Sequence, residues 1–381
     1  MFYYAANYIF DGKRFLKNAF VSLDENGFVN YLSEEGEALQ EKSGMSFYNG
    51  ILAPGFVNAH CHLELSGFQK EYGAKPGLTN FVRSVLKNRS SNTNDNQIKL
   101  ADRKMYERGI SLVGDISNTS LTIETKLQSK IHYKTFVEIS GLVPSDAEIR
   151  YNQGKAIKQT FLERDLSAEI SLHSLYSVSA ELIGKFNANS KSISTSLHFL
   201  ESSEETEMYF QNKGRLFDFL SANFADFKPI CNNSECLSKI LESLNADKLI
   251  LVHNVQLDKP FDSDKYFYCL CPRSNKQLHD ELPSHSFVEQ IKDSFVIGTD
   301  SLASNNYLSI IDELKYLEST YHFLSLKDLL KSATYNGANA LDELNMFGSL
   351  EPGKKPGLIL IENADLKELK LGEEASSRRI V

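Results

Sequence analysis

The sequence has no apolar run long enough to span a bilayer and no low-complexity tract. Its first residues, MFYYAANYIFDGKRF, lack the basic start, apolar core and small-residue cleavage site of a secretory signal. Basic residues number 41 against 50 acidic ones, and the formal net charge of −9 argues against nucleic-acid binding by a basic face. We therefore expect a cytoplasmic protein that acts on a small molecule, without a membrane or nucleic-acid partner.

The cysteines are few and show no metal-binding pattern. They are Cys61, Cys231, Cys236, Cys269 and Cys271. Cys269 and Cys271 are too close for a usual structural pair, and Cys231 with Cys236 lacks the second half of a zinc-finger motif. A chain of 381 residues can also bury a core without disulfides. We expect reduced, mostly buried thiols and one large domain, alone or with a small satellite.

Both ends of the chain have the pattern of short strands separated by turns. The strands are expected at residues 3–10, 19–23, 28–32, 357–361 and 378–381. The Asn26-Gly27 step between two of them is a strong hairpin signal. Neither end has enough apolar residues for a core of its own. We therefore expect residues 1–50 and 350–381 to pair into one small β-sandwich.

Between the two ends, eight apolar runs rich in β-branched residues recur along the chain. They cover residues 51–59, 110–115, 135–140, 168–173, 192–198, 249–253, 266–270 and 295–298. Most lack strict alternation, as strands buried on both faces of a parallel sheet do. Helical patterns separate most of them, for example at 79–87, 98–108, 179–187 and 309–318. Eight strands alternating with helices predict an α/β protein with a (β/α)8 TIM-like barrel over residues 51–349.

Residues that can bind a metal follow several of these runs. The first run leads into His60 and His62, the fifth ends in His198, and Asp300 follows the eighth. Active sites of such barrels lie at the C-terminal ends of the strands, and two histidines two apart on a strand point to the same side. A lone His-x-His also occurs as a packed or exposed pair, but the other strand-end ligands favour a metal. We predict that His60, His62, His198 and Asp300 bind one divalent ion and leave a position open for water.

Further strand-end groups could carry proton transfer. Glu201, three residues after His198, is close enough to hand a proton to a substrate. Asp300 could take a proton from water, whose pKa a bound metal lowers toward about 7. His253, at the end of the sixth run, could donate a hydrogen bond to the attacking oxygen. Each could instead be an ordinary polar residue at a strand end, but together they favour a hydrolase.

These residues lie in motifs that resemble the amidohydrolase superfamily, specifically its chlorohydrolase and nucleoside or nucleobase deaminase branch. The motifs are residues 54–62, 171–179, 197–201, 251–254, 271–275, 298–305, 333–338 and 348–357. The resemblance implies a flanking β-sandwich, a substrate-pocket role for His173, and a catalytic metal for which zinc is the expected ion and iron the alternative. Because 135–140 and 168–177 contain no lysine for a carboxylated bridge, we expect one ion per chain. Relatives of this kind are often dimers, so a homodimer is compatible with the resemblance.

One motif bears on the substrate. Residues 60–66, HCHLELS, resemble the aminofutalosine deaminases, which deaminate an adenine base. Glu64 would then accept hydrogen bonds from the substrate or, equally, cap the next segment as a structural residue. Arg273, and with less support Arg83, could grip a substrate carboxylate because a guanidinium offers a fork of donors. The long segment 203–247, between the fifth and sixth runs, could add contacts.

The expected chemistry is hydrolytic deamination of an amino-substituted N-heterocycle or nucleoside. In this hypothesis Glu201 protonates the ring nitrogen, Asp300 takes the proton of the attacking water, and His173 positions the amine before ammonia leaves. Two other classes stay open. One is an amidohydrolase or chlorohydrolase that uses the same site on another C–N or C–Cl bond, and the other is a non-catalytic metal-binding relative.

Overall fold

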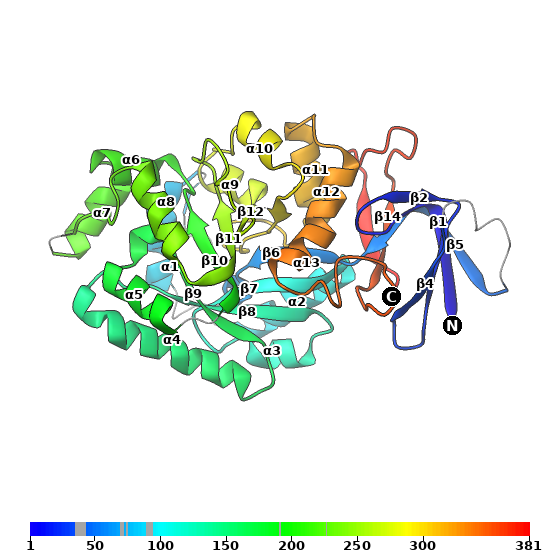
Figure 1. The fold of residues 1–381 in the computed structure, drawn as a ribbon, viewed down its shortest axis with the longest axis horizontal. Coiled ribbons are helices and arrows are strands. Elements are labelled where there is room, and N and C mark those ends of the chain that lie inside the picture. The colour runs from blue at the N-terminus through cyan, green and yellow to red at the C-terminus, as the bar shows by residue number, and fades with distance from the viewer. Residues whose placement is uncertain (35–42, 69–71, 74, 89–93, 190–191, 226) are drawn as a thin grey trace.

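A computed structural model describes residues 1–34, 43–68, 72–73, 75–88, 94–189, 192–225 and 227–381. The larger part of the molecule holds eight parallel strands in two four-stranded sheets (Figure 1). In chain order they are β6 (Phe56–Cys61), β7 (Ile110–Ser117), β8 (His132–Ile139), β9 (Ala168–Leu172), β10 (Ser192–Phe199), β11 (Ala246–His253), β12 (Tyr266–Leu270) and β13 (Val296–Ile297). The last seven lie where the sequence predicted strands.

The two sheets join at both edges and close a barrel. β9 and β10 meet at a parallel bridge beside His198, whose backbone N–H donates to the His173 carbonyl at 2.9 Å. β6 and the chain after β13 meet at a bridge between Cys61 and Asp300, and the Asp300 N–H donates to the His60 carbonyl at 3.1 Å. These contacts confirm the predicted (β/α)8 barrel and bring widely separated strand ends to one rim.

The prediction of one continuous strand at residues 51–59 is wrong, because the structure has two strands there. β5 (Met45–Pro54) belongs to the sheet formed by the chain ends, and β6 begins the barrel. Between them, a Cβ atom on Gly55 would lie only 1.8 Å from Ser111 Oγ, so only glycine fits this turn. The run looked continuous because the end of β5 and all of β6 are buried. The expected boundary between residues 50 and 51 therefore falls inside β5.

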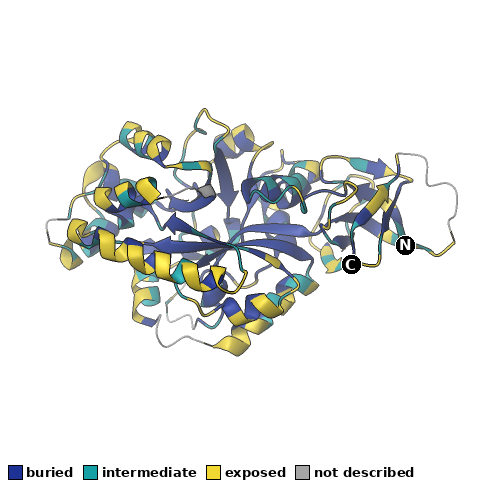
Figure 2. Cartoon of the chain, turned by 60° about the horizontal axis from the view of Figure 1, so that its bottom comes forward, coloured by how far each residue is buried: buried dark blue, intermediate teal, exposed yellow. Residues whose placement is uncertain are grey.

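Helices cover the outside of the barrel, with their exposed faces turned to solvent (Figure 2). They are α1 (Gly77–Asn88), α2 (Asp95–Glu107), α3 (Ile123–Gln128), α4 (Ala147–Leu162), α5 (Ala180–Asn189), α6 (Ser203–Gln211), α7 (Arg215–Asn223), α8 (Ser234–Ser243), α9 (Pro272–Leu278), α10 (His285–Ile291), α11 (Ile310–Thr320), α12 (Leu326–Lys331) and α13 (Gly337–Ala340). The four predicted helices are confirmed as α1, α2, α5 and α11. Segment 203–247, of which residue 226 lies outside the described residues, folds into α6, α7 and α8. In the described part of the chain, no helix is both long and apolar enough to cross a bilayer.

The two ends of the chain pair with each other, as predicted. β1 (Phe2–Phe10), β2 (Phe15–Lys17), β3 (Phe20–Leu23), β4 (Val29–Leu32), β5, β14 (Leu358–Glu362) and β15 (Ser376–Arg379) form one seven-stranded sheet. β14 runs antiparallel to β5, with Leu360 opposite Leu52, and both side chains enter a small apolar core. Figure 1 places this sheet beside the barrel, with both termini in it. Of residues 1–50, those at 35–42 lie outside the described part.

One expectation about the cysteines is corrected. Cys231 and Cys236 form a disulfide, with Cα atoms 5.5 Å apart. Cys236 lies in the first turn of α8, where Asn233, the N-cap, accepts from the Cys236 N–H at 2.8 Å, and Cys231 lies just before this turn. The remaining three cysteines are free and buried, as expected. The reduced state predicted for all five was therefore wrong for this pair, because spacing alone did not show that the turn brings the sulfurs together.

Candidate metal and catalytic site

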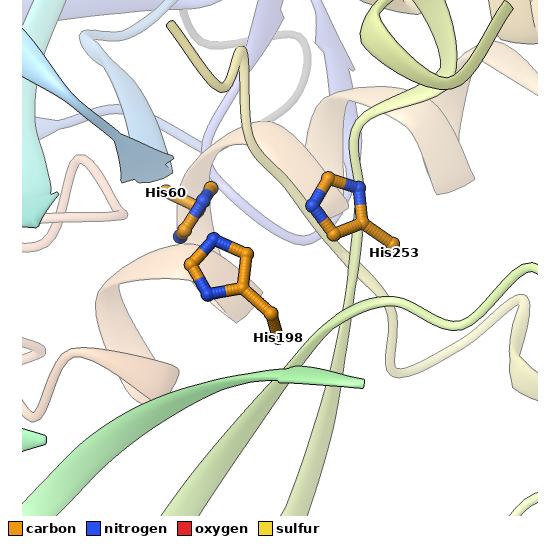
Figure 3. A group of neighbouring side chains, drawn as sticks. All are labelled: His60, His198 and His253. Atoms are coloured by element: carbon orange, nitrogen blue, oxygen red, sulfur yellow. The ribbon is translucent and has the colours of Figure 1, made fainter. Parts of the chain in front are cut away.

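Five polar side chains meet at the C-terminal rim of the barrel. His60 lies on β6 and His62 follows that strand, His198 lies on β10, His253 ends β11, and Asp300 follows β13. All five residues are buried. Figure 3 shows the rings of His60, His198 and His253 turned toward one another from three different strands. The barrel thus gathers in one place groups that the sequence had only aligned with strand ends.

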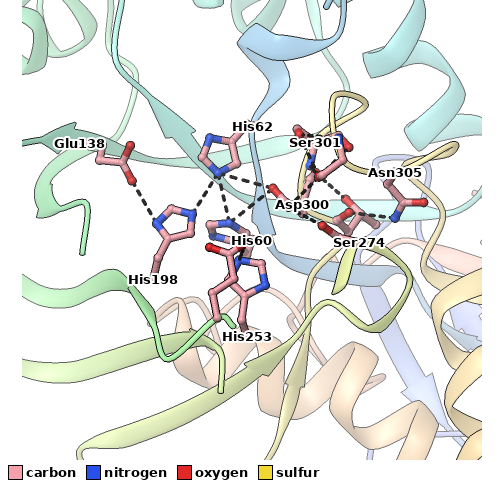
Figure 4. Close-up of polar contacts among 12 residues, drawn as sticks. His60, His62, Glu138, His198, His253, Ser274, Asp300, Ser301 and Asn305 are labelled. Atoms are coloured by element: carbon pink, nitrogen blue, oxygen red, sulfur yellow. Dashed lines mark hydrogen bonds and ion pairs between the residues drawn. The ribbon is translucent and has the colours of Figure 1, made fainter. Parts of the chain in front are cut away.

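Four donor atoms of the predicted metal ligands converge. His62 Nε2 lies 3.2 Å from His60 Nε2 and 3.3 Å from His198 Nε2. Asp300 Oδ1 lies 3.6 Å from His62 Nε2 and 3.9 Å from His60 Nε2 (Figure 4). Ligand atoms at about 2.1 Å from a tetrahedral ion lie roughly 3.4 Å from each other. The distances from His62 Nε2 to the other three donor atoms are therefore close to those expected around one ion, and His60, His62 and Asp300 form a group that could hold it.

Hydrogen bonds fix the direction of the Asp300 carboxylate. Its Oδ2 accepts from the hydroxyl groups of Ser274 and Ser304, both at 2.6 Å. Its backbone has a φ of 56°, an uncommon conformation for a residue with a side chain, and the bond from its N–H to the His60 carbonyl holds it there. Because the serines occupy Oδ2, Oδ1 is the oxygen that faces the histidines.

The pKa values of His60, His62 and His198 are shifted in different directions by their surroundings. Burial lowers the pKa of His60 well below its usual range, and the neighbouring imidazoles lower it further. Burial also lowers the pKa of His62, although Asp300 opposes it. For His198 burial acts in the same direction, but the hydrogen bond and charge of Glu138 outweigh it and raise the pKa to about 9. The first two rings are therefore neutral, the form in which imidazole binds a metal.

Two acceptors hold the far nitrogen of His198. Its Nδ1 donates to the His173 carbonyl at 3.0 Å and lies 3.3 Å from Glu138 Oε1. Nε2 is therefore the nitrogen left to face His62. A second group that orients the imidazole in this way is typical of metal-binding histidines.

The carboxylate of Glu201 lies between two histidines. Its Oε1 is 3.2 Å from His279 Nε2 and 3.8 Å from His253 Nε2. Burial raises the pKa of Glu201, but the charges and hydrogen bond of these two rings outweigh it and hold the pKa well below its usual value. His253 is oriented by a bond of 2.7 Å between its Nδ1 and Asn275 Oδ1. Glu201 is therefore an ionised base beside the converging donor atoms.

A cavity of about 440 Å³ opens above the rim. Its floor is polar and includes His62, His173, His198, Glu201, His253 and Asp300. Its wall is mostly apolar and comes largely from α1 and α7, with Leu78, Phe81, Val82, Val85, Phe219 and Leu220. Arg150, on α4, is the one arginine or lysine among the described residues that line the cavity. One bound molecule could therefore place a flat polar ring against the polar side chains of the floor and an apolar group against the wall.

His173 lies at the cavity, as the sequence led us to expect. Its Nδ1 is 2.8 Å from Ser177 Oγ and 3.0 Å from Ser174 Oγ. Burial is the main reason that its pKa falls to about 4. His173 therefore presents a neutral ring to whatever enters the cavity.

Glu64 is buried but does not line the cavity. Its carboxylate accepts from the backbone N–H groups of Asn118 and Thr119 at 3.1 Å and from Thr119 Oγ1 at 2.8 Å. These bonds anchor the chain that follows β7, where Asn118 itself lines the cavity. The structure thus matches the structural alternative for Glu64 rather than a direct contact with substrate.

The two arginines singled out from the sequence lie elsewhere. On α9, the Arg273 guanidinium stands 5.7 Å from the Tyr307 ring, and the Arg273 backbone N–H donates to Glu313 at 3.1 Å. Arg83 lies over the Phe219 ring at 4.8 Å. Neither lines this cavity, so the structure gives no support to Arg273 as a substrate-gripping residue here, and that role stays a prediction. The helix that begins at Pro272 directs Arg273 toward α11, which spacing along the chain could not show.

Several residues of the site were missed from the sequence. Glu138 lies inside the predicted strand at residues 135–140, one residue before the end of β8, so a search of strand ends alone would not single it out. Ser274 lies in one of the quoted motifs without a role. His279 and Arg150 lie on or just after helices, and no pattern in the sequence connects them with the strand ends.

Comparison with known proteins gives the site its context. Adenosine deaminase of Helicobacter pylori (strain ATCC 700392 / 26695) is 29% identical over 332 residues, which cover 82% of this chain and 79% of the relative. Helicobacter pylori aminofutalosine deaminase, crystallised with methylthio-coformycin, has a similar fold, with a TM-score of 0.77, 23% identity and coverage of 96% of this chain and 93% of that one. A zinc-bound adenosine deaminase from Xanthomonas campestris has a TM-score of 0.72, 18% identity and coverage of 97% and 87%. The amidohydrolase family model matches residues 51–376, and the chain therefore belongs to the amidohydrolase family.

Proposed function

We propose that this protein is a cytoplasmic, zinc-dependent deaminase that removes the amino group of an adenine-type base by hydrolysis. The observation that carries the proposal is the convergence of the donor atoms of His60, His62, His198 and Asp300 beside the ionised carboxylate of Glu201. The Helicobacter pylori relatives, one named adenosine deaminase and the other aminofutalosine deaminase, support it.

His60, His62, His198 and Asp300 would hold the ion. Three imidazole nitrogens and one carboxylate oxygen suit zinc, and also iron, at a site with an open position. The zinc in the Xanthomonas campestris structure favours zinc. When bound, the ion supplies the Lewis acidity that makes a water nucleophilic near neutral pH. One ion per chain is proposed, because the donor spacing fits one.

Glu201 and Asp300 would move the two protons of the attacking water. Because its depressed pKa leaves Glu201 unprotonated at neutral pH, it takes the first proton from the water and delivers it to the ring nitrogen. Asp300, whose Oδ1 would also face the ion, carries the second proton to the departing amine. The products are then an oxo-substituted ring and ammonia, and every proton is accounted for.

The two other histidines would act by hydrogen bonding. His253 lies against Glu201, and because its Nδ1 donates to Asn275 Oδ1, its Nε2 would donate to the oxygen added to the ring carbon as an imidazolium. His173, neutral because of its burial, would face the amine. The apolar wall above them fits a nucleoside whose sugar carries an apolar group, and Arg150 would pair with a carboxylate at the far end of that group.

Ammonia release from a panel of substrates tests the proposal. The panel is adenosine, 5′-methylthioadenosine, S-adenosylhomocysteine, aminofutalosine, guanosine, a pterin and a triazine, and zinc is counted per chain in the same preparation. We expect ammonia from at least one adenine nucleoside, about one zinc per chain, loss of activity after chelation and its return with zinc. The chelated and restored samples serve as matched controls for each other.

The alternatives give different products. Halide from a chlorinated triazine, or an amine from an amide, without ammonia from any adenine nucleoside would replace the deaminase by a chlorohydrolase or an amidohydrolase. A chain that binds one zinc tightly and turns over no compound would instead be a non-catalytic relative. That second outcome is disfavoured by the ionised Glu201 at the cavity floor.

A further inference from the structure

A lysine is fully buried inside the protein beside the metal site but outside the cavity. Lys126, on α3, has a side chain with no exposed surface, and its Nζ lies 2.6 Å from Asp115 Oδ2, on β7. The same nitrogen donates to Thr135 Oγ1, on β8, at 2.8 Å. Burying two charges is costly unless they are paired and hydrogen-bonded, so this arrangement needs a reason.

The second oxygen of Asp115 points to the residue after His62. Asp115 Oδ1 accepts from the Leu63 backbone N–H at 2.8 Å, while Ser117 Oγ donates to Oδ2 at 3.0 Å. Leu63 opens a short 3-10 helix, Leu63–Leu65, and His62 is the residue that precedes it. Fixing the N–H of Leu63 fixes the peptide plane between His62 and Leu63, and with it the direction from which the His62 ring leaves the backbone.

Neither charged residue can act on a substrate directly. Asp115 and Lys126 are absent from the cavity lining, and both are closed off from solvent. Lys126 is packed over the rings of Phe161 and Tyr133, at 4.8 and 5.3 Å. The lysine neutralises the Asp115 carboxylate and holds its Oδ2 in place. The other oxygen, Oδ1, accepts from the backbone N–H of Leu63, the residue after His62.

We propose that Asp115 and Lys126 are positioning residues of the metal site, which set the orientation of His62 through the Leu63 N–H. Lys126 holds Asp115 in one rotamer, Asp115 holds the peptide after His62, and the imidazole is thereby kept 3.2 and 3.3 Å from the other two histidines. Groups that orient a ligand in this way typically change metal affinity by about 10–100-fold when they are removed. The inference rests on the metal site proposed above.

Two double variants separate positioning from simple packing. Asp115→Leu with Lys126→Met removes both charges together with the acceptor for Leu63. Asp115→Asn with Lys126→Met also removes both charges but keeps an amide oxygen for the Leu63 N–H, and so serves as the matched control. The measurements are zinc affinity by chelator competition, the visible spectrum of the Co²⁺-loaded protein, and the melting temperature of the metal-free protein.

We expect the Leu/Met variant to bind zinc about 10-fold or more weakly than the Asn/Met variant, with a changed Co²⁺ spectrum and a similar metal-free melting temperature. Equal zinc affinity and equal spectra in the two variants would overturn the inference. If the Leu/Met protein does not fold, Asp115→Ala with Lys126→Met replaces it under the same criterion. Wild-type protein that binds no zinc would instead overturn the proposed metal site, so the two failures are distinguishable.

Discussion

The carboxylate of Glu138 lies 3.3 Å from His198 Nδ1, on the side of the imidazole opposite the nitrogen that faces His62. Glu138 is buried, and its pKa is held well below the usual range by His173 and His198, although burial acts against this. A buried anion in this position fixes both the ring orientation and the nitrogen that carries the hydrogen.

We therefore expect Glu138→Gln to weaken zinc binding by about 10–100-fold, because an amide can no longer orient His198 by charge. Chelator competition measures the affinity. Glu169→Gln is the matched control, since that carboxylate pairs with Lys158 outside the cavity. Zinc affinity unchanged within about twofold, in a variant as stable as the control, would show that Glu138 does not act on the metal site.

Removal of the base tests proton transfer separately from metal binding. Glu201→Gln keeps the shape of the side chain but can neither take nor give a proton. We expect kcat to fall by about 10²–10⁴-fold with zinc content unchanged. Glu207→Gln, on α6, controls for the loss of a negative charge. A variant with zinc bound and near-normal kcat on a confirmed substrate would remove Glu201 from the mechanism.

The raised pKa of Glu205 predicts that the stability of the protein depends on pH. Burial, and after it the charge of Glu201, raise the pKa of Glu205 to about 8, against a hydrogen bond of 2.8 Å from the Glu201 N–H. Because the folded pKa is raised, the stabilisation is fully present below the unfolded pKa of about 4.5 and is lost as the pH rises through about 8.

Glu205→Gln removes this titration, so the variant should gain stability over the wild type as the pH rises from about 5 to 8. Each unit of pKa shift corresponds to about 1.4 kcal/mol, and a gain on the order of 1 kcal/mol or more is expected at pH 8. Urea midpoints at pH 5, 6.5 and 8 measure it, with Glu207→Gln as the control. A stability difference that stays constant across this range would contradict a protonated Glu205.

Because Arg150 lines the cavity, we predict that its charge contributes to substrate selectivity. Its replacement by methionine keeps an apolar side chain of similar length but removes the charge. We expect KM to rise about tenfold for S-adenosylhomocysteine, which carries a carboxylate, and to stay unchanged for 5′-methylthioadenosine, which does not. Steady-state kinetics on both substrates provide the test. Parallel changes in both KM values would mean that Arg150 acts on cavity shape rather than on a carboxylate.

The cluster of proposed metal ligands was accessible from the sequence because barrel strands end in register at one rim. His60, His62, His198 and Asp300 each close a buried apolar run, and any fold that aligns such runs in parallel brings their ends together. The same rule placed Glu201 and His253. These predictions needed only the period of the apolar pattern and the polar residue that follows each run.

The partners of these residues were decided by tertiary structure. His279, Ser304 and Lys126 lie beyond or between the strands, and they reach the site through the packing of α9, the turn after β13, and α3. Arg273 and Glu64 show the converse, since they stand close to site residues in the sequence but point to Glu313 and to Asn118. A strand constrains its side chains to alternate faces, whereas a helix or turn can direct a side chain to any side.

By itself, then, the sequence determined the barrel, the pairing of the chain ends and the rim where the ligands meet, because repeating apolar patterns specify these features locally. Tertiary structure alone decided which oxygen of Asp300 is free, which nitrogen of His198 faces the site, and how a buried lysine is held beside it. Those choices depend on contacts within about 3 Å between residues far apart in the chain, and no local pattern encodes such distances.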